Sequence, residues 1–72
     1  MAGKEVFNIE GKFQVLDTDN PNIWLVNAEG KEIGQVRRQG RGILVLVAPA
    51  LYHGLSQDEQ IKFGQFVDHI RD

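Results

Sequence analysis

Ile43 to Ala48 is an unbroken run of six apolar residues, rich in β-branched side chains, between Gly42 and Pro49. A run of this kind, bounded by glycine and proline, is typical of a short strand that is buried on both faces. At the edge of a sheet it would be an aggregation hazard, and Arg41 and Pro49 stand where gatekeeper residues protect such a strand. We therefore predict a strand at 43–48 in the centre of a sheet.

Four further strands are predicted from shorter apolar or alternating segments. Phe13 and Val15 alternate with Gln14, which is the period-two pattern of a half-buried strand. Gly11 and Gly30 fall at turns between strands, where glycine supplies the positive φ that a tight hairpin requires. The predicted strands are 5–9, 12–16, 23–28, 32–38 and 43–48.

Gly34 interrupts the fourth predicted strand. Ile33 and Val36 are three positions apart and out of phase for one flat face, so we expect a bulge or a sharp bend at Gly34. The connections between strands are too short for the crossovers that parallel pairing needs. The strands are therefore predicted to form an antiparallel meander.

The C-terminal segment carries the clearest helix signal. Ser56 and Glu59 have the spacing of a capping box, in which each side chain accepts a hydrogen bond from the backbone N–H of the other residue. The residues that follow place one apolar stripe on a helix at 57–70. The stripe consists of Phe63, Phe66, Val67 and Ile70. Gly64 flanks it, and we expect this glycine to let the helix lie close to the sheet. A single helical turn is expected at 49–52.

These elements predict one α+β domain over residues 1–72: a curved antiparallel β-meander of about five strands, half-barrel-like in shape, packed by one C-terminal α-helix. The segments 23–26 and 43–48 are apolar on both faces, whereas one helix can cover only one face of a sheet. Either the sheet curls on itself, or a partner protein or a second copy covers the other face. The sequence leaves both solutions open.

Composition narrows the class of protein. A chain of 72 residues, 42% apolar and 25% charged, has the size and composition of one globular domain. Because cysteine is absent, we expect neither a disulfide framework nor a thiolate metal site, and we predict no cofactor. The formal net charge of −2 argues against a strongly basic nucleic-acid-binding protein. No segment has the character of a signal peptide or a membrane span, so a cytoplasmic protein without membrane contact is expected.

Three arginines cluster around a glycine turn. Arg37, Arg38 and Arg41 fall within five positions, and a projecting hairpin tip would present them together. Guanidinium groups bind phosphate oxygens bidentately, so this cluster is a candidate site for phosphate or nucleic acid. The alternative is that the three charges only solvate a loop and protect a strand edge.

The residues that suggest catalysis have better structural explanations. His53 and His69 are the only histidines, and with Ser56 and Asp68 they invite comparison with a catalytic triad. Ser56, however, is explained as a helix cap, and Asp68 and His69 are adjacent on a helix and so point in different directions. No histidine pair has the helical spacing of a metal site. We therefore predict that the protein is not an enzyme and holds no metal.

The predicted function is that of a non-catalytic protein-interaction domain, either a homodimer or a small adaptor or inhibitor that docks on a larger protein. The apolar strand surface exceeds what one helix can cover, and Ile61 lies opposite the apolar stripe of its helix. Ile61, Leu51 and Tyr52 are the candidate interface residues. The alternative function is nucleic-acid binding through the arginine hairpin at 37–41.

Overall fold

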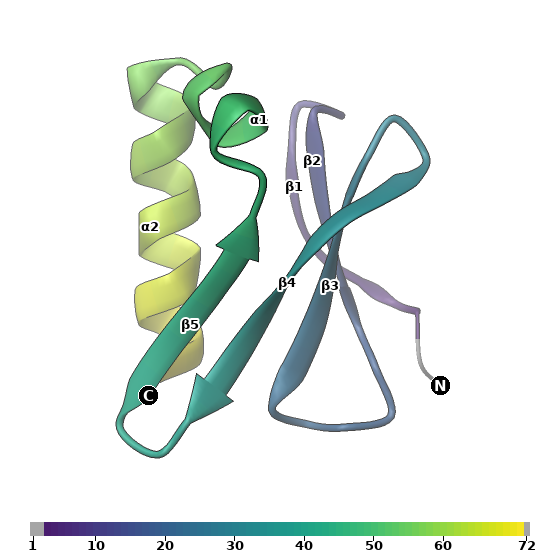
Figure 1. Ribbon diagram of the computed structural model, residues 1–72, viewed down its shortest axis with the longest axis vertical. Coiled ribbons are helices and arrows are strands. Elements are labelled where there is room, and N and C mark those ends of the chain that lie inside the picture. The colour runs from purple at the N-terminus through teal and green to yellow at the C-terminus, as the bar shows by residue number, and fades with distance from the viewer. Residues whose placement is uncertain (1–2, 72) are drawn as a thin grey trace.

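The computed structural model describes residues 3–71 and consists of one five-stranded antiparallel sheet and two helices (Figure 1). The strands follow one another across the sheet in the order β1-β2-β3-β4-β5, and the sheet does not close. The elements are β1 (Glu5–Ile9), β2 (Phe13–Asp17), β3 (Ile23–Ala28), β4 (Lys31–Gln39), β5 (Gly42–Val47), α1 (Pro49–His53) and α2 (Gln57–Arg71). The predicted fold class is confirmed, and each predicted element begins and ends within one residue of its observed limits.

Two of the hairpins turn through the sequence Glu-Gly. Glu10 has φ 47° and Gly11 φ 79°, and Glu29 has φ 53° and Gly30 φ 80°. Two successive residues with positive φ make a type I′ turn, whose twist matches that of the strands on either side. The expected roles of Gly11 and Gly30 are confirmed. A glutamate in the left-handed region is uncommon, and in both turns it precedes the glycine.

The expected irregularity at Gly34 is also present. Val26 of β3 pairs with Gly34, and Asn27 pairs with Glu32, so Ile33 is left over as the extra residue of a β-bulge. A side chain at Gly34 would collide with the carbonyl group of Leu46 and lie 2.9 Å from its carbon atom. This glycine therefore lets β4 and β5 approach one another at the bend.

One face of the sheet, here called the inner face, packs against α2. Its buried side chains are Ile9, Phe13, Val15, Val26 and Val36, and those of α2 are Glu59, Phe63, Phe66, Val67 and Ile70. Phe7 of β1 stacks on Phe66 with the ring centres 4.7 Å apart, and Phe13 meets Phe63 edge-on at 6.0 Å. The predicted apolar stripe of the helix is confirmed as its contact with the sheet.

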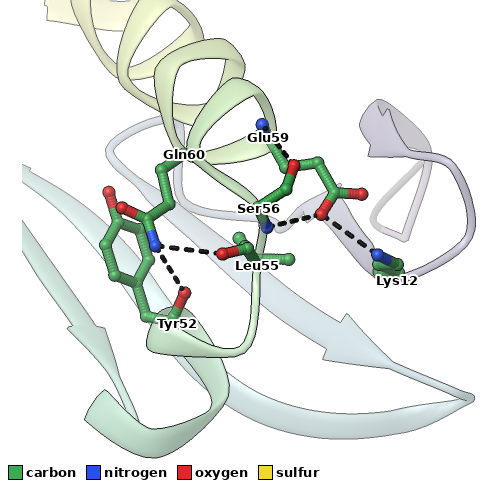
Figure 2. Close-up of polar contacts among 6 residues, drawn as sticks. All are labelled: Lys12, Tyr52, Leu55, Ser56, Glu59 and Gln60. Carbon is green, nitrogen blue, oxygen red and sulfur yellow. Dashed lines mark hydrogen bonds and ion pairs between the residues drawn. The ribbon is translucent and has the colours of Figure 1, made fainter.

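The N-terminus of α2 is fixed by the predicted capping box (Figure 2). The backbone N–H of Ser56 donates to Oε1 of Glu59 at 2.8 Å, and the N–H of Glu59 donates to the Ser56 hydroxyl at 3.2 Å. Nζ of Lys12, next to the first hairpin turn, lies 3.1 Å from the same Oε1. The Ser56 N–H first, and then Lys12, hold the pKa of the Glu59 carboxyl below its usual range. The box therefore joins α2 to the β1–β2 hairpin.

Gln60 joins the two helices at the same place. Its side-chain Nε2 donates to the carbonyl oxygen of Leu55 at 3.1 Å and to that of Tyr52 at 3.4 Å (Figure 2). Both acceptors lie at the end of α1 or in the link that follows it. The amide thus gives the Leu55 carbonyl a donor and adds a second donor to the Tyr52 carbonyl, which also accepts from the backbone N–H of Leu55 at 3.1 Å.

The prediction that 43–48 is a central strand buried on both faces is wrong. β5 is an edge strand, and Leu44, Val45 and Leu46 are 42%, 39% and 48% exposed. The physical reason lies in the topology. In a meander the last strand has a neighbour on one side only, and after β5 the chain continues into helices. The apolar run indicates side chains whose burial would be favourable, but it does not show whether other parts of the chain bury them.

The expected role of Gly64 is wrong as well. A side chain at this position would find no atom within 4 Å, so the glycine is not needed for a close approach of α2 to the sheet. Gly64 instead lies exposed beside the apolar stripe.

Candidate interaction surface along β5

The free edge of β5 presents an unbroken row of backbone hydrogen-bonding groups. Gln39 and Gly42 pair across the two-residue turn that joins β4 to β5, and such a flanking pair exchanges hydrogen bonds. Because hydrogen-bonded pairs alternate along an antiparallel ladder, the N–H and C=O groups of Ile43, Val45 and Val47 point away from β4. No strand pairs with this side of β5 among residues 3–71.

The outer face of β5, opposite α2, is apolar and open to solvent. Leu44 and Leu46 point to this face because Val45 lies across from the buried Val36 on the inner face. Leu25 lies in the same row as Leu46 on the outer face but is only half-exposed, since it has neighbours on both sides. Three of the four exposed large apolar side chains of the sheet therefore lie on β5, and the fourth, Val6, lies on β1.

On the inner face an open groove of about 500 Å³ separates β5 from α2. Val45 and Val47 form one wall, and Phe63 and Val67 contribute to the other. Gly64 also lines the groove. Because this residue has no side chain and no atom lies within 4 Å of where one would start, the groove is wider on the side of α2. Figure 1 shows β5 as the strand drawn beside α2, and the two elements are in contact. The edge of β5 is therefore accessible from the outer face and from the groove.

The charged side chains near the groove lie on the helix and not on the strand. Asp68 and Arg71 line it and face one another at 3.7 Å, as an exposed ion pair one turn apart. Exposed pairs of this kind contribute little to stability. β5 itself carries no charge between Gly42 and Val47.

The three predicted phosphate-binding arginines are not brought together on one face. Arg37 and Arg38 are neighbours on β4, so their side chains point to opposite faces of the sheet. Arg37 donates from Nε to Oε1 of Gln35 at 3.0 Å, and Arg41 lies exposed in the turn before β5.

Arg38 is engaged in internal contacts. Its Nη1 donates to the carbonyl oxygen of Ile70 at 2.7 Å, and its Nε donates to Oδ1 of Asn22 at 3.1 Å. Its guanidinium group also lies 5.4 Å from the centre of the Trp24 ring. Arg38 thus links the C-terminal end of α2 to β4. Of the three arginines in the predicted cluster, only Arg37 and Arg41 are left for a ligand.

The predicted interface residues lie in three different places. Tyr52 lines the groove and is half-buried, with its ring 6.0 Å from that of Phe63. Leu51 is 44% exposed and lines another hollow, between α1 and the two Glu-Gly turns. Ile61 is 52% exposed, on the side of α2 away from the apolar stripe, as expected. The predicted interface residues do not include Leu44 to Leu46, the exposed apolar run of the sheet. The signal that could have indicated them is the place of their strand at the end of a meander, where one edge stays free.

The residues considered for catalysis are scattered. Ser56 is the helix cap, and the two histidines are exposed at the ends of different helices. Within residues 3–71 no three His, Cys, Asp or Glu side chains are grouped as a metal site would require. In the same part of the chain neither helix has the length and apolar character to cross a membrane. Comparison with models of known families, with curated protein sequences and with solved structures finds no match for this chain.

Proposed function

We propose that this protein is a non-catalytic protein-interaction domain that binds by strand addition along β5. The observation that carries the proposal is an uncharged edge strand whose outer side pairs with no strand among residues 3–71 and whose side chains are 39–48% exposed at Leu44 to Leu46. Soluble proteins commonly protect such edges with charges, bulges or proline. Between Gly42 and Val47 this strand has none of them, which is the arrangement expected of an edge that a partner covers.

In this mode of binding, the backbone and the side chains have separate roles. An incoming extended segment forms ladder hydrogen bonds with Ile43, Val45 and Val47, which give affinity without regard to sequence. Its alternate side chains enter the groove against Val67 and Gly64 or lie beside Leu44 and Leu46 on the outer face. Those contacts supply the selectivity, because successive side chains of a strand face opposite sides.

The test is a selection of displayed random decapeptides on the wild-type protein, followed by affinity measurements with an edge-blocked variant. Val45→Pro removes an N–H that points away from β4, so the fold is kept while the ladder loses a donor. Val45→Thr is the matched control, because it has a similar shape and retains the N–H. We expect selected peptides to bind the proline variant at least about tenfold more weakly than the threonine variant. Equal binding to both, or no enriched peptides, would contradict strand addition.

A further inference from the structure

We infer that the strand that adds to β5 is β5 of a second copy of this chain, paired antiparallel about Val45. The inference rests on the proposed function and names its partner. A twofold-symmetric interface must be self-complementary. If residue i of the first copy contacts residue j of the second, then residue j of the first copy contacts residue i of the second. β5 meets this condition in its sequence, in its charge and in its position in the fold.

The strand reads almost the same in both directions from Val45. Antiparallel pairing about that residue places Val45 opposite Val45 of the second copy and each Leu44 opposite a Leu46. The next pair outward joins Ile43 to Val47, which differ by one methylene group. Every cross-strand pair is therefore between aliphatic side chains of similar size, which is the kind of pair that stabilises a sheet.

Charge favours the same register. No charged residue lies between Gly42 and Ala48, so nothing on the strand repels its copy. The first charge outside the strand is that of Arg41, and in this register the Arg41 residues of the two copies lie at opposite ends of the paired strands. Like charges directly opposite one another on paired strands would be destabilising, and this register avoids them.

The other edge of the sheet, β1, favours a closed dimer over an open filament. Joining β5 of one copy to β1 of the next would repeat without end and build a filament. β1, however, has Val6 as an extra residue between the paired positions Glu5 and Phe7, and it carries Glu5 on the edge itself. A bulge and a charge both discourage strand addition. Pairing of β5 with β5 uses the unprotected edge of each copy and leaves β1 at the outside.

The surroundings of β5 leave room for a second strand. On the outer face, Leu44 and Leu46 of each copy cover those of the other, which removes the most exposed leucines of the sheet from water. On the inner face, Val45 and Val47 of the second copy come to the mouth of the groove beside Gly64, where a side chain would meet no atom within 4 Å. A mid-helix glycine exposed at this point is compatible with the close approach of another backbone.

Cysteine cross-linking tests the partner and the register together, because the chain has no cysteine of its own. Leu44 and Leu46 of two copies form a pair that is not hydrogen-bonded, with Cα atoms about 4.5 Å apart. Two Leu44 positions are out of register by two residues and about 8 Å apart, too far for a disulfide. We expect an equimolar mixture of Leu44→Cys and Leu46→Cys proteins, combined when reduced and then oxidised, to give at least about fivefold more covalent dimer than either alone. Equal yields in the mixture and in the separate samples would overturn this register.

Sedimentation of the full chain provides the second measurement. Val6 and Leu44 are both 42% exposed, on the two opposite edge strands, so Val6→Lys is the matched control for Leu44→Lys. We expect the wild-type protein and the Val6 variant to dimerise equally and the Leu44 variant to dissociate with at least a tenfold higher Kd. Circular dichroism confirms the fold of each variant. A wild-type protein that stays monomeric at millimolar concentration would overturn the inference, whereas peptide binding that depends on Val45 would still support strand addition.

Discussion

The two edges of this sheet are built in opposite ways. On β1 the Glu5 carboxylate accepts hydrogen bonds from the side chains of Asn8 at 2.7 Å and Gln14 at 2.9 Å, next to the bulge at Val6. These contacts, led by that of Asn8, hold the pKa of Glu5 below its usual range. β5 has neither a charge nor a bulge. Both strands lie at the ends of one sheet, so the need for a folded core does not explain the difference between them. The difference agrees with the binding role that we propose for β5.

The edges also differ in how they are held to α2. The β1–β2 hairpin is joined to the helix by the ion pair of Lys12 with Glu59, at its N-terminal end. The β4–β5 hairpin is joined to it by the hydrogen bond of Arg38 to Ile70, at its C-terminal end. Between these points the helix touches the β1 side through stacked phenylalanine rings, whereas a groove remains on the β5 side. The β5 edge, where we propose that a strand is added, is thus less tightly packed against α2 than the β1 edge.

The largest expected effect is that of Gly34→Ala, which attacks the support of β5. The new methyl group would collide with the backbone of Leu46, and a backbone cannot move aside without breaking the β4–β5 ladder. We expect a loss of about 3 kcal/mol or more in the free energy of unfolding, measured by urea denaturation. Amide hydrogen exchange should show that protection is lost first in β5 and last in β2. A loss below about 1 kcal/mol would show that the close approach at Gly34 is dispensable.

A smaller effect is expected when the connection of α2 to β4 is removed. Arg38→Met deletes the bonds to Ile70 and Asn22, and because Arg38 is half-buried we expect a loss of about 1–2 kcal/mol. Arg37→Met is the matched control, since it removes the same charge from the other face of β4, and it should change stability by less than about 0.5 kcal/mol. Thermal unfolding of the two variants measures the difference. Equal losses would mean that net charge, and not the helix contact, is responsible.

Gly64→Ala should act in the opposite direction. The position is exposed, helical and surrounded by empty space, so alanine should stabilise the isolated protein by about 0.5–1 kcal/mol through its higher helix propensity. The added methyl group projects into the groove beside β5, and we therefore expect weaker binding of a strand there. A variant that is more stable and yet binds more weakly would separate the two roles of this position. Unchanged binding would place the partner strand away from the helix.

The smallest effect concerns pH and the β1 side. The folded-state pKa of Glu59 is lowered, so its contribution to stability is full above the unfolded-state pKa and is lost as pH falls through the folded-state pKa. Urea midpoints between pH 7 and pH 3 should therefore fall more steeply for the wild-type protein than for Glu59→Gln. Lys12→Met should reduce the steepness only in part, because the Ser56 N–H remains as the larger cause of the lowered pKa. Identical pH profiles would show that the capping box does not respond to acid.

Local sequence signals predicted most of this fold. Gly11 and Gly30 indicated the turns, Ser56 and Glu59 indicated the start of α2, and each signal depends on residues close together in the chain. Gly34 was predicted correctly as a bend for the same reason, since a break in periodicity is visible within a few residues. Where the chemistry of a turn or a helix cap decides the backbone conformation, the neighbouring residues in the sequence are enough to predict it.

The exposed apolar surface of β5 could not be predicted in the same way. The apolar run at Ile43 predicts a central strand because such a run is an aggregation hazard at an edge and because Arg41 and Pro49 flank it. Whether water, a helix or another molecule lies beside a strand depends on contacts distant in sequence, and an apolar pattern is the same in each case. The predicted role of Gly64 is wrong because a glycine that admits a neighbour and one that faces empty space look alike in a sequence.

The strand order has a consequence for the rate of folding. Each strand pairs with the one before it, through connections as short as two residues, so most contacts of the sheet form between segments that are close along the chain. Short loops lose little entropy on closing, and proteins dominated by such contacts fold fast, on the order of milliseconds. Successive hairpins can therefore assemble the sheet before α2 docks on it. We expect the refolding kinetics to be single-exponential and little affected by Gly64→Ala.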